Sequence, residues 1–224
     1  MDGDFRVLLK KAWPVVGLVI VLWGIHLFQW MTDGGLTFLG VYPRKVSGLI
    51  GILTAPLIHG SWGHLASNSV PLLVLGATLS VFFPKIAGRV WLVSWLATGL
   101  WVWIAARNSY HIGASGVVFA LAFFLFFQGI FNRNVKTLTI SLIVAFLYGG
   151  LVWQVLPIQE GVSWESHLFG GVAGVILAWF FRKSGPKKKT YGWETEEERP
   201  EDRYDSWNYK EMFPPPEGFG YPEE

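Results

Sequence analysis

The sequence predicts an all-α membrane protein whose helices cross the bilayer six times. Of its 224 residues, 52% are hydrophobic and only 15% are charged, which is too apolar for an ordinary soluble domain. The apolar residues form six runs, each close to the roughly 20 residues that a spanning helix needs. These runs cover approximately 12–31, 64–83, 89–106, 115–131, 137–156 and 167–183. The 26 glycines fit this class, because small residues let helices pack closely in lipid.

The first run is expected to stay in the mature chain as a membrane helix. It extends from Trp13 to Met31, long enough to span, and no small-residue cleavage site follows it. The long first loop, about 32–63, is mostly apolar from Val41 to Ile58. We therefore expect it to lie in or near the membrane interface as ordered structure, and not as a free linker.

The distribution of basic residues predicts that both termini are cytoplasmic. Lysine and arginine cluster in four places on one side. Arg6, Lys10 and Lys11 precede the first run, and Lys85 and Arg89 lie between the second and third. Arg133 and Lys136 lie between the fourth and fifth, and Arg182, Lys183 and the lysines at 187–189 follow the sixth. The opposite side has only Arg44, Lys45 and Arg107. The second, fourth and sixth runs would then all begin in the outer leaflet, where they carry His64, Ser115 and His167.

Composition changes sharply after Ser184-Gly185-Pro186. Residues 190–224 are rich in Glu, Asp, Pro and Gly with interleaved Trp and Tyr, so we expect a largely disordered tail. Its mixture of acidic and aromatic residues suits recruitment of a soluble partner or a purely solubilising role. No nucleotide-binding loop is found, and no nucleic-acid partner is expected. Without cysteine the chain has no disulfide, no thiolate metal site and no thiol catalysis.

Ser115 is the first candidate for chemistry, because it lies between glycines where an apolar run begins. In Gly113-Ala114-Ser115-Gly116 the glycines would allow a tight entry into the helix. The hydroxyl would then be accessible, and backbone N–H groups would point at a developing oxyanion. The structural alternative is that these small residues only allow close helix packing.

His167 is a candidate general base at the start of the sixth run. Gly170 and Gly174 are four residues apart and share a helix face, and His167 lies one turn earlier on that side. This face would bring the imidazole against a closely packed partner helix. Glu165 is a neighbour in sequence but need not point the same way, and a Ser–His pair can work without a carboxylate. The alternative is an idle interfacial histidine.

His64 and Asn68 are four residues apart on one helix face, and both can donate hydrogen bonds as oxyanion stabilisers must. His59 is expected in the turn before this helix, where a role in a local polar network is favoured. His26 lies within the first run and is expected to pack or to form an interhelical hydrogen bond.

Zinc is the main competing chemistry, since His59, His64, His111 and His167 could supply ligands. No His-Glu-x-x-His pattern exists, however, and the spacing of His59 and His64 does not place both on one helical face. We expect no metal and no cofactor.

Taken together, three motifs resemble the rhomboid family of intramembrane serine proteases. They are His59-Gly-Ser-Trp-Gly-His64-Leu-Ala-Ser-Asn68, then Gly113-Ala-Ser115-Gly116, then His167 with Gly170 and Gly174. The resemblance covers residues 12–183 and includes the order, the spacing and the placement on the second, fourth and sixth runs.

The resemblance implies a Ser115–His167 dyad, with His64, Asn68 and the Ser115 amide forming the oxyanion hole. It implies that His59 is structural and that Tyr42-Pro43-Arg44 belongs to a first-loop element. One departure is Phe119, because some rhomboids have tyrosine four residues after the serine. The predicted organisation is a cytoplasmic N-terminus (1–11), a six-helix rhomboid-like protease domain (12–183) and an acidic cytoplasmic tail (184–224).

The expected function is an intramembrane serine endopeptidase that cuts transmembrane segments of single-span or multi-span membrane proteins. The alternative is a catalytically inactive rhomboid-like protein that binds membrane clients. A transporter lacks support, because neither paired broken helices nor intramembrane carboxylates are found. The basic loops indicate a multi-pass protein of a bacterial-type plasma (inner) membrane.

Overall fold

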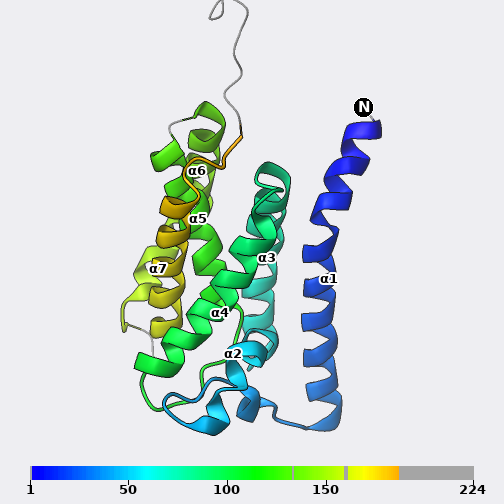
Figure 1. Cartoon of the computed structure of the whole chain (residues 1–224). Helices are drawn as coiled ribbons and strands as arrows, with labels where there is room; N and C mark the ends of the chain where they lie inside the picture. The colour runs from blue at the N-terminus through cyan, green and yellow to red at the C-terminus, as the bar shows by residue number, and fades with distance from the viewer. Residues whose placement is uncertain (1, 133, 159–160, 187–224) are drawn as a thin grey trace, which may run out of the picture. The chain divides into compact units, whose positions relative to one another are not determined.

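Helix α5, Ser115–Asn132, lies at the centre of the bundle and carries the candidate nucleophile at its first residue (Figure 1). The structure is a computed structural model in which residues 2–132, 134–158 and 161–186 are described. About 61% of the apolar segment of α5 is buried, against 17–39% in the other long apolar helices. A side chain on α5 is therefore surrounded by protein, whereas the outer helices expose much of their surface to the bilayer.

The described part of the chain is all-α, as predicted, and it has no β-strand. The α-helices are α1 (Asp2–Thr32), α2 (Gly51–Thr54), α3 (Trp62–Phe82), α4 (Ala87–Ala105), α5, α6 (Val135–Tyr148) and α7 (Trp164–Phe180). Short 3-10 helices are η1 (Thr37–Leu39), η2 (Val46–Gly48), η3 (Ala55–Leu57) and η4 (Gly149–Val155).

Five helical segments of the described chain are long and apolar enough to cross a membrane. They are Lys10–Thr32, Trp62–Phe82, Ala87–Ala105, Ser115–Asn132 and Val135–Val155. Each overlaps one of the predicted runs, with starts and ends that agree within a few residues. Helix α7 has 17 residues and is shorter than these five. Its role as a sixth span, and the cytoplasmic side of both termini, stay predictions.

Two predicted boundaries differ from the helices of the structure. Helix α1 begins at Asp2, well before residue 12, because the prediction followed hydropathy and the polar residues up to Lys11 continue the helix. The fifth predicted run, 137–156, divides into α6 and η4 at Gly149-Gly150. A glycine pair weakens an α-helix by leaving the backbone more conformational freedom. The predicted tail lies almost entirely outside the described residues.

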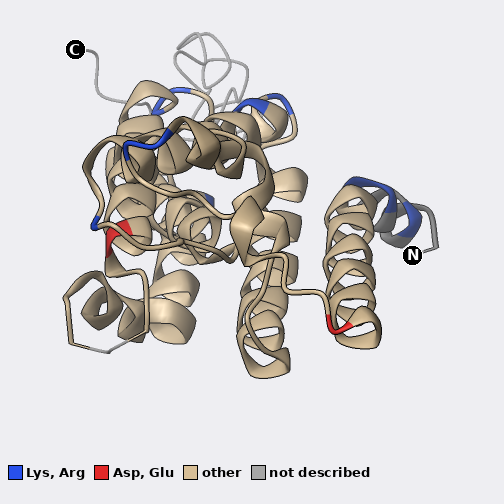
Figure 2. Cartoon of the chain, turned by 90° about the horizontal axis from the view of Figure 1, so that it is seen from below, with Lys and Arg blue, Asp and Glu red and all other residues tan. Residues whose placement is uncertain are grey.

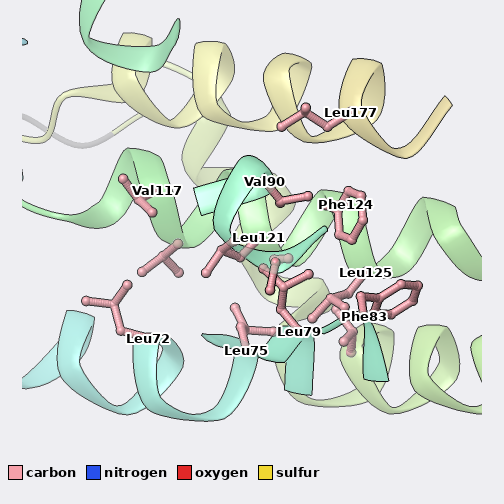
Figure 3. Close-up of a cluster of buried hydrophobic side chains, with 14 of the residues drawn as sticks. Leu72, Leu75, Leu79, Phe83, Val90, Val117, Leu121, Phe124, Leu125 and Leu177 are labelled. Atoms are coloured by element: carbon pink, nitrogen blue, oxygen red, sulfur yellow. The ribbon is translucent and has the colours of Figure 1, made fainter. Parts of the chain in front are cut away.

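A core of leucine, valine and phenylalanine joins α3, α4, α5 and α7 (Figure 3). Leu72, Leu75 and Leu79 of α3 face Leu121 and other apolar residues of α5, and these side chains are fully buried. On α4, Val90 closes the same core. In lipid this packing stabilises the bundle through close contact, since exposed and buried apolar groups have similar surroundings.

Glycines bring α5 and α7 into backbone contact. A Cβ placed on Gly170 would collide with the carbonyl oxygen of Gly116, and one on Gly174 would collide with that of Ala120. The predicted glycine face of α7 therefore packs directly on the helix that begins with Ser115.

The first loop is ordered and packs against the C-terminal half of α4. Trp103 donates its indole N–H to the Lys45 carbonyl at 2.9 Å, and Trp95 donates to the Leu53 carbonyl at 3.1 Å. Arg44 donates to the Asn108 side chain and to the Ile104 carbonyl. Charged residues gather in such loops and at helix ends, and leave the walls of the helices apolar (Figure 2).

Candidate active site

Ser115 and His167 are in hydrogen-bond contact across the α5–α7 interface. The Ser115 Oγ lies 2.9 Å from the His167 Nε2. The two residues are 52 positions apart in sequence, and each lies in the first turn of its helix. His167 is buried and Ser115 is partly exposed. This is the contact that a serine nucleophile and its base require.

The hydrogen bond on the other side of His167 determines the tautomer of its ring. The His167 Nδ1 lies 2.9 Å from the carbonyl oxygen of Gln154 in η4. A carbonyl only accepts, so Nδ1 carries the proton and donates it. In the neutral ring Nε2 is then the acceptor, oriented to receive the proton of the Ser115 hydroxyl.

An aromatic ring holds the plane of the imidazole. Phe119 stacks on His167 with ring centroids 4.2 Å apart and planes 4° apart. Phe119 is one turn after Ser115 on α5, so the nucleophile and the ring that supports its base come from one helix. The phenylalanine supplies this contact without the hydroxyl that a tyrosine would add.

Gly113 shapes the entry to α5. Its φ of +104° lies in the region that favours glycine, and its N–H donates to the Ala55 carbonyl at 2.9 Å. A Cβ on Gly113 would lie 2.6 Å from Nε2 and Cε1 of His64. Both the backbone conformation and the close approach of His64 therefore need glycine here.

His64 and Asn68 lie beside this turn. Asn68 is buried, and its Nδ2 donates to the His64 carbonyl at 3.1 Å. That Nδ2 also lies 3.7 Å from where a Gly113 Cβ would be, so both side chains approach the segment that leads to Ser115. At the start of α5, backbone N–H groups have no acceptor within the helix. The side chains of His64 and Asn68 thus lie beside Gly113, two residues before Ser115.

His59 supports His64 from the turn before α3. The two imidazole rings lie 5.1 Å apart, nearly edge to face, and His59 is buried with neither ring nitrogen hydrogen-bonded among the described residues. Burial, together with the neighbouring His64, lowers the pKa of His59 to about 4. His59 is therefore neutral at physiological pH.

Two other predicted candidates lie away from the dyad. Glu165 is turned toward Arg107, with Oε1 3.5 Å from the Arg107 Nε, and does not orient His167. His26 is buried against the edge of Trp62 at a centroid distance of 4.5 Å and packs as a hydrophobic ring. Within the described residues, no three His, Asp or Glu side chains come together as ligands of one metal ion would.

The sequence did not indicate Gln154, which contacts His167, or Ser163, which lies near the site, and it suggested His111 only as a possible zinc ligand. Gln154 acts through its backbone carbonyl, for which side-chain identity gives no signal. Ser163 caps α7 by accepting from the Ser166 N–H, and it also contacts His111. A serine just before a helix that has Glu165 in its first turn is a recognisable capping signal and could have identified Ser163.

Comparison with known proteins identifies the family of this chain. A family model described as Rhomboid domain matches residues 46–184. An uncharacterized protein of Mycobacterium tuberculosis is 36% identical over 80% of each chain. One of Mycobacterium leprae is 33% identical over 81% of this chain and 76% of its own. The rhomboid-like protein 11, chloroplastic, of Arabidopsis thaliana is 25% identical over 78% of this chain and 67% of its own. The chain therefore belongs to the rhomboid family.

Proposed function

We propose that this protein is an intramembrane serine endopeptidase that cleaves transmembrane segments of other membrane proteins near their outer-leaflet end. The observation that carries the proposal is the Ser115 Oγ–His167 Nε2 contact of 2.9 Å, with Nδ1 held by the Gln154 carbonyl. The basic loops support an outer-leaflet position for this pair in a bacterial-type inner membrane.

In the proposed reaction the Ser115 oxygen attacks the scissile carbonyl carbon, while Nε2 of His167 takes the hydroxyl proton. The carbonyl oxygen becomes an oxyanion, which His64, Asn68 and the Ser115 N–H stabilise. His167 then gives the proton to the leaving amine, and the peptide bond breaks. Water, activated by the same histidine, hydrolyses the acyl-enzyme and restores Ser115.

The substrate has to present an extended peptide bond to this site. A transmembrane helix satisfies its own backbone hydrogen bonds, so a few residues must unwind before the carbonyl reaches Ser115. Segments with small or helix-weakening residues near the outer end are thus the favoured class, in single-span or multi-span proteins.

A serine-directed covalent probe tests the proposal. The detergent-purified protein should react with a fluorophosphonate, and peptide mass spectrometry should locate the adduct on Ser115. Ser115→Ala and His167→Ala should abolish labelling. Ser94→Ala is the matched control, because the Ser94 hydroxyl is buried without a hydrogen-bond partner among the described residues. A correctly folded wild-type protein that is never labelled would instead favour an inactive client-binding protein.

A further inference from the structure

The dyad depends on how firmly two chain segments are joined. Ser115 directly follows the loop between α4 and α5, and His167 lies in the first turn of α7. A shift of this turn along α5 would lengthen the Oγ–Nε2 hydrogen bond. The described structure places a buried histidine, His111, between the two segments, and the proposed dyad does not use it.

His111 joins the α4–α5 loop to the N-terminus of α7 through its side chain. Its Nδ1 lies 2.6 Å from the Oγ of Ser163, the residue that caps α7. The same Oγ lies 2.6 Å from the Ser166 Oγ and accepts the Ser166 N–H. Ser166 directly precedes His167, so His111 is connected to the base through hydrogen bonds to residues in the first turn of α7.

The position of each proton in the His111–Ser163–Ser166 series of hydrogen bonds follows from a backbone carbonyl, which accepts but cannot donate. The His111 Nε2 lies 3.0 Å from the Arg107 carbonyl, so Nε2 carries the proton in the neutral ring. Nδ1 then accepts the Ser163 hydroxyl proton, and Ser163 in turn accepts the Ser166 hydroxyl proton. Burial lowers the pKa of His111 below its usual value, which agrees with a neutral ring. Each of these three side chains is thereby hydrogen-bonded.

The first loop also holds the backbone of His111. The His111 backbone N–H donates to the Val41 carbonyl at 2.9 Å, and the His111 carbonyl accepts from the Val41 backbone N–H at 3.0 Å. The side chain is only 3% exposed. The His111 side chain is therefore held in one position by burial and by hydrogen bonds. A residue that fixes one segment against another needs this rigidity.

A second connection between the same segments runs in parallel. Arg107 donates its Nη2 to the Val162 carbonyl at 2.6 Å and pairs with the buried Glu165. The backbone N–H of Arg107 also donates to Glu165, at 3.4 Å. The α7 N-terminus is thus held at Val162, Ser163 and Glu165, immediately before the base.

We propose that His111 is a positioning residue for the Ser115–His167 dyad, which it serves by bonding Ser163 and so fixing the first turn of α7 against the entry to α5. This inference rests on the proposed protease function. His111 does not touch the reacting atoms, and its effect reaches the reaction only through the placement of His167.

Two substitutions separate the bonds that His111 makes. The side-chain amide of His111→Asn lies near the position of Nδ1 and can still reach Ser163. The amide of His111→Gln reaches instead toward the position of Nε2 and the Arg107 carbonyl. His111→Phe keeps an aromatic ring and removes both bonds. Thr54→Val is the control, because it removes a partly buried hydroxyl hydrogen bond to the Leu39 carbonyl in the first loop, away from α7.

The experiment measures cleavage of a transmembrane substrate in liposomes, with active sites counted by complete fluorophosphonate labelling. For His111→Phe we expect kcat per labelled site to fall roughly 10- to 100-fold with KM little changed, as when a catalytic group is misplaced by about 1 Å. The acid limb of the pH profile of kcat should also shift, because the surroundings of His167, the proposed base, change. His111→Asn should recover most of the rate and His111→Gln much less. Thr54→Val should lower only the melting temperature.

The outcomes distinguish the two proposals. If wild type cleaves and His111→Phe loses only melting temperature or labelled fraction, with kcat per site and pH profile unchanged, the positioning role is wrong. Equal rates for the Asn and Gln variants would likewise contradict a role through Ser163. If folded wild type neither labels nor cleaves, the protease proposal itself fails.

Discussion

The base of the proposed dyad is oriented by a backbone carbonyl in place of an acidic side chain. His167 donates from Nδ1 to Gln154, while the nearest carboxylate in sequence, Glu165, is paired with Arg107. A neutral acceptor leaves no unpaired carboxylate beside the base, where burial without a cationic partner would carry a large desolvation cost. Phe119 adds the stacking contact, which restricts the ring to one plane.

Substitution of Asn68 tests the proposed oxyanion hole. Its side chain is buried beside Gly113, where it can donate to charge that develops only in the transition state. Asn68→Ala should lower kcat by roughly tenfold to a thousandfold and change KM much less. Steady-state kinetics on a transmembrane substrate checks this. An unchanged kcat with reduced thermal stability alone would assign Asn68 a purely structural role.

The lowered pKa of His59 predicts that folding stability depends on pH. Its folded pKa of about 4 lies below the ordinary value of 6.5, so the unfolded chain binds the additional proton first. Stability from this group is complete above pH 6.5 and is lost as the pH falls toward 4, by at most about 3 kcal/mol. In His59→Leu the acid-side loss should be smaller. Melting temperatures of both proteins between pH 8 and pH 4 decide it, and parallel curves would contradict the assignment.

At the scale of helices, the glycines of α7 determine how near His167 comes to Ser115. Gly170 and Gly174 allow backbone contact with α5, and their spacing of four residues is readable in the sequence. Sequence reasoning could therefore predict the approach of these two helices. It could not predict the link between His111 and Ser163, because nothing in the local pattern joins residues 52 positions apart.

Gly170→Ala tests this packing. The added methyl would collide with the Gly116 backbone, which cannot move aside like a flexible side chain, and overpacking of this kind costs about 1–3 kcal/mol. Both the melting temperature and the cleavage rate should fall. Gly24→Ala in α1 is the matched control, since a Cβ there meets nothing within 4 Å. Similar behaviour of the two variants would show that the α5–α7 contact is not tight.

Helix boundaries show where hydropathy alone falls short. The apolar runs located the five long apolar helices within a few residues. They missed the first ten residues of α1, half of which are charged, and the change to a 3-10 helix at Gly149-Gly150. The second miss matters for function, because η4 carries the Gln154 carbonyl that orients His167.

For the whole molecule, the site is assembled from helices that are distant in the chain. His64 and Asn68 come from α3, Ser115 from α5 and His167 from α7. The predicted topology places the start of all three in the outer leaflet, which is why motifs that are weak one by one become specific together. The tail beyond residue 186 is predicted on the other side of the bilayer, so it is not expected to supply catalytic groups.

The most direct test of this account is cleavage of a panel of single-span membrane proteins in liposomes by wild type and Ser115→Ala. Wild type should cut at least one of these substrates near the outer-leaflet end of its span, and Ser115→Ala should fold and insert normally without cutting any. Full cleavage by purified Ser115→Ala would contradict the assignment of Ser115 as the nucleophile.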